Sequence, residues 1–313
     1  MIVTLTPNPS LDRTAEVDTL VRGAVLRVTA ARVEPGGKGV NVARALVLNG
    51  HKSRAVLPSG GTEGAQLAAL LTAAGIDPVL VPVAGAVRTN VSVVEPDGTT
   101  TKLNEPGPTL SAAEVDALVA ATLSAAEGAE WVVLSGSLPP GAPEDFYARI
   151  IRALRGSGAR VVVDSSGPAL TAALPAGPDL IKPNREELAE ASGTGIRTMR
   201  DALHAAGQLR RQGAGAVLVS LGPDGALLVD ADGSVHGEGH AVRRSTVGAG
   251  DALLAGFLAG GGTGAPALAE ALAWGAAAVS LPGSRMPGPA DLDHSAVHLH
   301  PHVDLDLLLD HRS

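Results

Sequence analysis

Short apolar runs alternate with longer amphipathic or alanine-rich stretches along most of the chain. The runs are rich in β-branched residues and lack polar alternation, so they predict strands that are buried on both faces. The predicted strands are Ile2–Leu5, Arg54–Leu57, Pro78–Val83, Trp131–Leu134, Arg160–Asp164, Leu180–Ile181 and Ala216–Ser220. The predicted helices include Val40–Leu48, Gly64–Ala74, Ala112–Ala126, Glu144–Leu154 and Arg200–Gln212. This order predicts an α/β core with a mostly parallel central sheet that helices cover on both faces.

Two stretches, 11–33 and 88–104, interrupt this rhythm because they contain alternating segments and no good helix. The dipeptide Asp97-Gly98 in the second stretch is typical of a hairpin turn. We predict that the two stretches form a small β-sheet appended to the core. A sheet without a second layer has to cover something or pair with a copy of itself, so we expect a lid that is also a homodimer contact. The predicted core is the rest of the chain, residues 1–10, 34–87 and 105–313.

The last third of the chain contains shorter elements. Three segments predict antiparallel strands, and these are Gly225–Val229, Val235–Gly237 and Ala241–Arg243. The stretch Ala252–Ala269 is uncharged over the length of a membrane span, but the glycines at 260–264 interrupt it, so it predicts two helices joined by a loop. A cluster of histidines follows, made of His294, His298, His300 and His302. Such a polar segment is most often a solvated surface and only occasionally a metal site, because it has no cysteine and no neighbouring helix to orient ligands.

Composition narrows the class of protein. The 313 residues are 45% hydrophobic and 18% charged, which is typical of a folded protein with a large core. A net charge of −8 and an aromatic content of 2% argue against a nucleic-acid partner, because they provide neither a basic surface nor stacking platforms. The chain has no cysteine, which excludes disulfides and thiol catalysis. The N-terminal segment lacks the pattern of a secretory signal, and we expect a cytoplasmic protein with no membrane partner.

Glycine-rich loops carry the candidate chemistry, and each lies at a predicted strand end or helix start. The loops are "PGGKGVNVARAL" at 35–46, "SGSLPPG" at 135–141, "KPNREEL" at 182–188, "SLGPDGALL" at 220–228 and "TVGAGD" at 246–251. Loops at the carboxyl ends of parallel strands bind ligands in α/β folds, and helix N-termini stabilise anions. With Lys38, Asn41 and Asp251 among them, the loops predict a phosphorylated ligand. Arg32 and Leu253 stand where a P-loop and a dinucleotide fingerprint would each need a glycine, so neither motif is present.

Together these motifs resemble the PfkB (ribokinase-like) family of carbohydrate kinases, over essentially the whole chain. "PGGKGVNVARAL" is similar to the N-terminal signature of the family and "STVGAGDALLAGFL" to its C-terminal signature. "TPNPSLD", "KPNREEL", "SLGPDGAL" and "TKLNEPGP" are most similar to the branch of 1-phosphofructokinases and tagatose-6-phosphate kinases. The alanine-rich, lysine-poor composition resembles that of actinobacterial members of the family.

The resemblance implies a ribokinase-like fold and an ATP- and Mg²⁺-dependent kinase of a ketose phosphate, with fructose 1-phosphate as the expected acceptor. Tagatose 6-phosphate or fructose 6-phosphate is the alternative acceptor, and a silent sugar-phosphate-binding regulator is the alternative without catalysis. In such a kinase Asp251 accepts the proton of the attacking hydroxyl, while the turn before it donates N–H groups to the transferred phosphoryl group. Ser245 replaces an Asp that potassium-dependent members often carry, which argues against activation by a monovalent cation.

Matching motif positions assigns the remaining roles. The predicted catalytic residues are Asp251, Gly248, Ala249 and Gly250. The predicted acceptor site consists of Asp12, Gly36, Gly37, Lys38, Asn41, Arg88, Ser137 and Asp251, with Lys38 and Arg88 on the acceptor's phosphate. The predicted ATP site consists of Lys182, Asn184, Ser220, Leu221, Gly222, Pro223, Asp224, Gly225 and Gly250. Asn184 and Glu187 are predicted to organise Mg²⁺ through water, to cap a helix, or both. The alternatives for Asp12 and Arg88 are a turn carboxylate and an exposed surface arginine.

Overall fold

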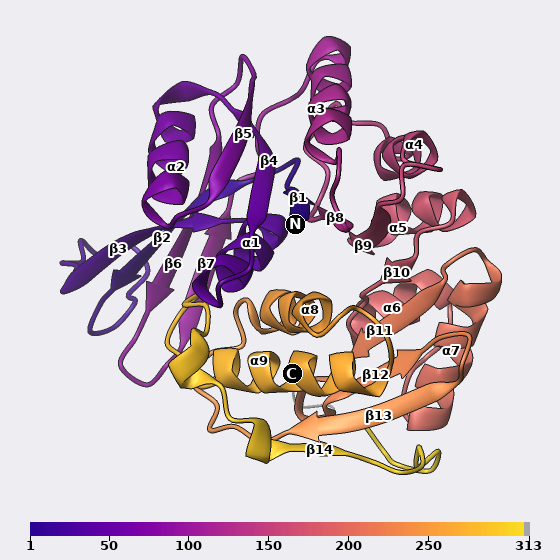
Figure 1. The fold of residues 1–313 in the computed structure, drawn as a ribbon. Coiled ribbons are helices and arrows are strands. Elements are labelled where there is room, and N and C mark those ends of the chain that lie inside the picture. The colour runs from indigo at the N-terminus through magenta and orange to yellow at the C-terminus, as the bar shows by residue number, and fades with distance from the viewer. Residues whose placement is uncertain (310–313) are drawn as a thin grey trace.

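A ten-stranded sheet forms the centre of the protein in the computed structural model, which describes residues 1–309 (Figure 1). Its strand order is β14-β13-β12-β11-β10-β9-β8-β1-β4-β5. The parallel strands are β1 (Ile2–Leu5), β4 (Ser53–Ser59), β5 (Asp77–Pro82), β8 (Trp131–Ser135), β9 (Arg160–Asp164), β10 (Leu180–Ile181) and β11 (Ala216–Ser220). Each predicted parallel strand is confirmed to within one or two residues at its ends. Three antiparallel strands complete the sheet at one edge, β12 (Ala226–Val229), β13 (Ser234–Gly239) and β14 (Val297–Leu299).

Helices cover both faces of this sheet, as the apolar strands predict. The helices are α1 (Lys38–Leu48), α2 (Gly61–Ala73), α3 (Ala112–Ala125), α4 (Phe146–Ala153), α5 (Gly167–Ala173), α6 (Arg185–Ser192), α7 (Met199–Arg211), α8 (Ala249–Ala259) and α9 (Gly264–Val279). Val132 of β8 packs among residues of α3 to α7, whereas its neighbours Trp131 and Val133 pack among residues of α1, α8 and α9. Adjacent residues of a strand point to opposite faces, so a continuous apolar run builds both halves of the core.

A second, four-stranded sheet lies beside this core, at the left of Figure 1. Its strands are β3 (Ala30–Gly36), β2 (Ser10–Glu16), β6 (Arg88–Val94) and β7 (Thr100–Asn104), in that order. The separated segments meet through the parallel pair β2–β6, and Gly98 takes a φ of 91° in the hairpin between β6 and β7. The predicted small sheet is therefore present. Its role as a lid and as a dimer contact stays a prediction.

The antiparallel edge corrects two predictions. Ala241–Arg243 is not a strand; the chain leaves the sheet after β13, and Val242 is largely exposed. The edge beside β13 is taken by β14, which belongs to the histidine-rich segment that the sequence places in solvent. Three residues are too few for a periodic pattern, and their pairing partner lies about sixty positions earlier in the chain.

The long uncharged stretch forms two helices, α8 and α9, as predicted. Gly256 allows them to pack closely, because a Cβ there would meet the backbone of Glu270 and the side chain of Trp274. Across residues 1–309, none of the helices combines the length and the apolar character needed to cross a bilayer.

Candidate active site

A cluster of charged side chains forms where strands β9 and β10 end and helices α1 and α6 begin. Asp164, the last residue of β9, is fully buried. The Nζ atom of Lys38 lies 2.8 Å from Oδ1 of Asp164, and Nζ of Lys182 lies 3.4 Å from its Oδ2. Lys38 also contacts Oε1 of Glu187 at 3.2 Å. Two lysines and two carboxylates thus neutralise one another at the carboxyl edge of the sheet, where α/β folds bind ligands.

Opposing effects fix the protonation states in this cluster. Burial opposes the charge on Asp164, but Lys182 and Lys38 outweigh it and hold the pKa of Asp164 below its ordinary value. Burial also opposes the charge on Lys38, but Asp164 and Glu187 raise the pKa of Lys38 above its ordinary value. At neutral pH Asp164 is therefore an anion and Lys38 a cation.

Asp251 stands in the first turn of α8, directly behind the predicted glycine turn. Gly248 has a φ of 78°, a left-handed conformation that favours glycine, and it is the residue before the helix. A Cβ on Gly250 would lie 3.4 Å from Nζ of Lys182, so a larger residue would crowd the approach of a ligand to this turn. The turn therefore brings backbone N–H groups and a lysine ammonium close together, an arrangement that stabilises a phosphoryl group.

The carboxylate of Asp251 is buried and has an unusual pKa. Burial is the largest cause of the increase from 3.8 to about 6, and the negative charge of Asp164 adds to it. A hydrogen bond from Nδ2 of Asn41 to Oδ2 of Asp251, 2.8 Å long, opposes the increase, as do the lysine charges. A carboxylate with a pKa near neutrality can both accept and release a proton at physiological pH.

A polar cavity of about 270 Å³ lies between this cluster and the small sheet. It is lined by Asn8, Ser10, Asp12, Gly37, Lys38, Arg88, Asn90, Gly136, Ser137, Ser165, Ser166 and Glu187. Five predicted acceptor residues are therefore together here: Asp12, Gly37, Lys38, Arg88 and Ser137. The other three, Gly36, Asn41 and Asp251, do not line the cavity. Gly36 backs Asp12, and Asn41 bonds to Asp251.

Asp12 is held in place by its neighbours rather than standing in a turn. It lies in β2, and its Oδ1 accepts hydrogen bonds from Ser10 at 2.7 Å and from Asn90 at 3.0 Å. Gly36 lies on the adjoining strand β3, where a Cβ would overlap the carboxylate of Asp12. The glycine is therefore needed to leave this carboxylate facing the cavity.

Arg88 begins β6 and is half-buried, not an exposed surface arginine. Its guanidinium donates to the carbonyls of Glu105 at 3.1 Å and Asn8 at 3.0 Å. Its buried Nε has no hydrogen-bond partner among residues 1–309, and the same holds for Oδ1 of Asn8 and Oδ1 of Asn90. Because buried polar atoms are usually paired, these atoms are unused hydrogen-bonding capacity in three residues that line the cavity.

The predicted ATP loops lie side by side. Asn184 forms a parallel bridge with Ser220, which brings the start of α6 next to the loop Ser220–Gly225. Asn184 caps α6 in a capping box with Glu187, whose Oε2 accepts from the N–H of Asn184 at 2.9 Å. The helix-cap interpretation is therefore correct, and it leaves Oε1 of Glu187 directed to Lys38.

A larger cavity, about 550 Å³, lies between α9 and residues 240–244, and none of the predicted ATP residues lines it.

Sequence reasoning missed three kinds of site residue. Asn90 follows Arg88 by two positions and faces the same cavity, so strand periodicity could have identified it. Asn8 and Ser10 stand inside the quoted "TPNPSLD" motif. Asp164 ends the apolar run "VVVD", and a carboxylate at the carboxyl end of a buried parallel strand is a usable signal.

These features define a class of enzyme. A buried carboxylate poised to accept a proton stands behind an anion-binding turn, and both lie near a polar cavity with hydroxyl acceptors and cations. This combination fits transfer of a phosphoryl group to an alcohol.

Comparison with known proteins agrees with this class. Residues 7–289 match the pfkB family of carbohydrate kinases. A 1-phosphofructokinase of Rhodobacter capsulatus is 41% identical over 261 residues, which are 82% of each chain. An ATP-dependent 6-phosphofructokinase isozyme 2 of Mycobacterium tuberculosis is 39% identical over 264 residues, 83% of this chain and 77% of that protein. Phosphofructokinase-2 from Escherichia coli, solved in complex with potassium, has a TM-score of 0.87 at 36% identity and covers 93% of this chain and 96% of its own.

The chain therefore belongs to the pfkB family of carbohydrate kinases. The predicted ribokinase-like fold and the predicted class, a sugar-phosphate kinase with ATP as donor, are confirmed.

Proposed function

We propose that this kinase transfers the γ-phosphoryl group of ATP to fructose 1-phosphate and forms fructose 1,6-bisphosphate. The observation that carries the proposal is the cavity in which Asp12 and Asn90, suited to sugar hydroxyls, face the same space as the cations Arg88 and Lys38. A neutral sugar would need hydroxyl partners alone, whereas two cations at the wall suit an acceptor that already carries a phosphate. Relatives named 1-phosphofructokinase support this acceptor.

In the proposed reaction Asp251 is the general base. The hydroxyl of the acceptor attacks the γ-phosphorus of ATP, its proton passes to the carboxylate of Asp251, and ADP leaves. Asn41 holds the carboxylate in place through its hydrogen bond. The N–H groups of Ala249, Gly250 and Asp251 at the start of α8 receive the charge that develops on the transferred group.

The phosphate of the acceptor is assigned to Arg88 and Lys38. Arg88 has a buried Nε without a partner in residues 1–309. An ammonium has three donors, and the two contacts of Lys38 with Asp164 and Glu187 leave a third donor for the cavity that Lys38 lines. Both contacts with a phosphate would be charge-assisted hydrogen bonds.

The nucleotide is assigned to Lys182, Asn184 and the loop Ser220–Gly225, which share one edge of the sheet. Mg²⁺ prefers oxygen ligands and retains several waters, so the predicted pair Asn184 and Glu187 would organise it through water. Beside this pair, the carboxylates of Asp164 and Glu187 fit such a site. Their present partner is the ammonium of Lys38, so these carboxylates already face a positive charge. When bound, Mg²⁺ would supply charge neutralisation at the phosphates of ATP.

A homodimer through the small sheet and a cytoplasmic location complete the proposal. Val25, Val28 and Leu103 are exposed apolar residues of the segments that form this sheet, and they support a contact with a second copy.

The proposal is tested by measuring ADP release with fructose 1-phosphate, fructose 6-phosphate and tagatose 6-phosphate as acceptors. We expect kcat/KM for fructose 1-phosphate to exceed the others by at least about tenfold, since each acceptor contact contributes about 1–3 kcal/mol. A preference for fructose 6-phosphate would instead assign this protein the activity for which its 6-phosphofructokinase relatives are named. Tight binding of all three sugars without ADP release would instead identify a silent regulator.

A further inference from the structure

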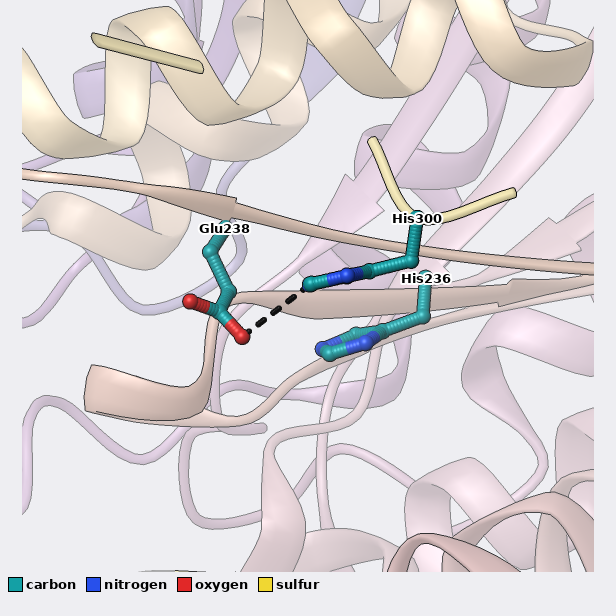
Figure 2. A group of neighbouring side chains, drawn as sticks. All are labelled: His236, Glu238 and His300. Carbon is teal, nitrogen blue, oxygen red and sulfur yellow. Dashed lines mark hydrogen bonds and ion pairs between the residues drawn. The ribbon is translucent and has the colours of Figure 1, made fainter. Parts of the chain in front are cut away.

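One face of the β13–β14 ribbon carries an array of potential metal ligands, next to the loop Ser220–Gly225 but outside the acceptor cavity (Figure 2). Gly237 and Gly239 of β13 face α9, because a Cβ on either residue would meet atoms of Leu272 or Ala276. His236 and Glu238 alternate with these glycines and therefore lie on the opposite face. His298 stands directly opposite Glu238 on β14, and the N–H of His300 bonds to the carbonyl of His236.

The side chains of His236, Glu238 and His300 converge. Nε2 of His300 lies 3.1 Å from Oε1 of Glu238. The rings of His236 and His300 stack with centroids 4.7 Å apart and planes 12° apart. One possible ligand atom from each of the three residues lies within 4.8 Å of the others. Around a zinc ion with bonds of about 2.0–2.2 Å, ligand atoms are about 3.3–3.6 Å apart, so small side-chain rotations bring this set to bonding distance.

A second contact orients one of the histidines. Nε2 of His236 lies 2.8 Å from the carbonyl oxygen of Asp224, and His236 is only 2% exposed. A carbonyl only accepts, so Nε2 is the donor in this contact and Nδ1 is the nitrogen that the contact leaves available to a metal. Ligand histidines in metal sites typically donate their other N–H to a backbone carbonyl or carboxylate in this way.

We propose that His236, Glu238 and His300 bind a divalent transition-metal ion of the zinc class. Two imidazoles and a carboxylate form a ligand set that suits zinc and leaves one further position for water or another ligand. His298 is exposed and its ring centroid lies 4.8 Å from that of His300, so a rotation of its side chain would supply a fourth ligand. The site differs from the magnesium site in its nitrogen ligands, because Mg²⁺ prefers oxygen.

The test uses the full-length, metal-free protein with Mg²⁺ in excess, so that oxygen-rich sites are occupied. Calorimetric titration with Zn²⁺ is expected to show one ion bound per chain. The variants Glu238→Gln and His300→Ala should each weaken this binding at least about tenfold. The matched control His204→Ala removes an exposed histidine of α7, outside the array, and should bind Zn²⁺ as the wild type does.

Two further readouts keep the result independent of folding. Circular dichroism and the Tm without metal show whether each variant is folded, and Glu238→Gln preserves the size of the side chain and one oxygen that can accept a hydrogen bond from His300. At one Zn²⁺ concentration, the Tm of the wild type and of His204→Ala should rise by more than the Tm of Glu238→Gln. Co²⁺ should give visible d–d absorption that is lost in the two array variants. Unchanged stoichiometry and affinity in folded Glu238→Gln and His300→Ala, or no zinc binding by the wild type, would overturn the proposal.

Discussion

Asn41 on α1 donates a hydrogen bond of 2.8 Å to the carboxylate of Asp251 on α8, 210 positions later in the chain. Both side chains are buried, and each belongs to one of the two long motifs that characterise this sequence. The bond fixes the direction of the carboxylate, and it opposes the increase in its pKa that burial causes. The two motifs therefore meet in one functional unit, in which Asn41 positions and tunes the proposed base.

The first prediction removes the base. Asp251→Asn preserves the size of the side chain and can still accept a hydrogen bond from Asn41, so both substrates should bind with nearly unchanged KM. The loss of proton acceptance should lower kcat by about 10²–10⁴-fold, the usual scale for a general base. Steady-state kinetics with each substrate varied in turn measure both quantities. Asp232→Asn, at an exposed turn, is the control, and an Asp251→Asn enzyme that keeps about a tenth of the wild-type kcat would exclude Asp251 from this role.

The second prediction concerns pH. The pKa of Asp251 in the free protein is about 6, and only the ionised carboxylate accepts a proton. As pH falls through this value Asp251 becomes protonated, so kcat/KM should decline below about pH 6 and reach a plateau above about pH 7. The measurement is the rate at concentrations of ATP and acceptor well below their KM values, which reports the free protein, from pH 4.5 to 8.5 in buffers of constant ionic strength. An acid limb centred near pH 4 would mean that burial does not perturb the base.

The third prediction uses Asn41 to shift that limb. Asn41→Leu removes a hydrogen bond that favours the ionised form of Asp251. A hydrogen bond to a charged group contributes about 1.5–3 kcal/mol, which corresponds to about 1–2 pKa units. The acid limb of kcat/KM should therefore move to higher pH by about that amount. A purely structural role of Asn41 would lower activity at every pH without moving the midpoint, and that result would contradict the tuning role.

The fourth prediction relates function to stability. The folded protein raises the pKa of Asp251 from 3.8 to about 6, so it binds more protons than the unfolded chain between these values. Stability from this group is then present below pH 3.8 and is lost as pH rises through about 6. At 1.36 kcal/mol per unit, the ionised carboxylate costs up to about 3 kcal/mol at pH 8. Asp251→Asn should thus raise the free energy of unfolding at pH 8, and the gain should shrink toward pH 4. Urea unfolding at both pH values measures it, and an equal gain at both would assign the effect to packing.

The fold could be predicted where local pattern and tertiary burial coincide. Strands such as Trp131–Ser135 are buried on both faces, so their apolar run identifies them without further information. The small sheet could be predicted because Gly98 and the alternating residues around it interrupt the succession of apolar strand runs and helical stretches that forms the core. β14 could not, since three residues have no period and only β13 makes them a strand.

Within the site, Asp251 could be predicted because its chemistry and its turn are adjacent in sequence. The role of Asp164 could not be read in the same way, since its partners Lys182 and Lys38 lie 18 and 126 positions away. The carboxylate after an apolar run marks the ligand-binding edge of the sheet, but its contacts with the two lysines become visible only once the sheet brings them to it. The same holds for Lys38, whose motif indicates a cation near phosphate and gives no sign of its two carboxylate partners.

The last prediction separates the acceptor phosphate from the nucleotide. If Lys38 and Arg88 bind the phosphate of the acceptor, each charge-assisted contact should contribute about 1.5–3 kcal/mol. Lys38→Ala and Arg88→Ala should then each raise KM for fructose 1-phosphate by roughly 10–150-fold, at 1.4 kcal/mol per decade. The KM for ATP should change little in Arg88→Ala, because Arg88 lies on the side of the cavity formed by the small sheet.

Lys38 provides the sharper test, since its ammonium also contacts Asp164 and Glu187. If those contacts mean that Lys38 serves the nucleotide, Lys38→Ala will raise KM for ATP and leave KM for the acceptor unchanged, which would contradict its assignment to the acceptor phosphate. Lys38→Arg is the companion variant, because it keeps the positive charge and should recover part of the acceptor affinity only if charge at this wall of the cavity is what binds the phosphate.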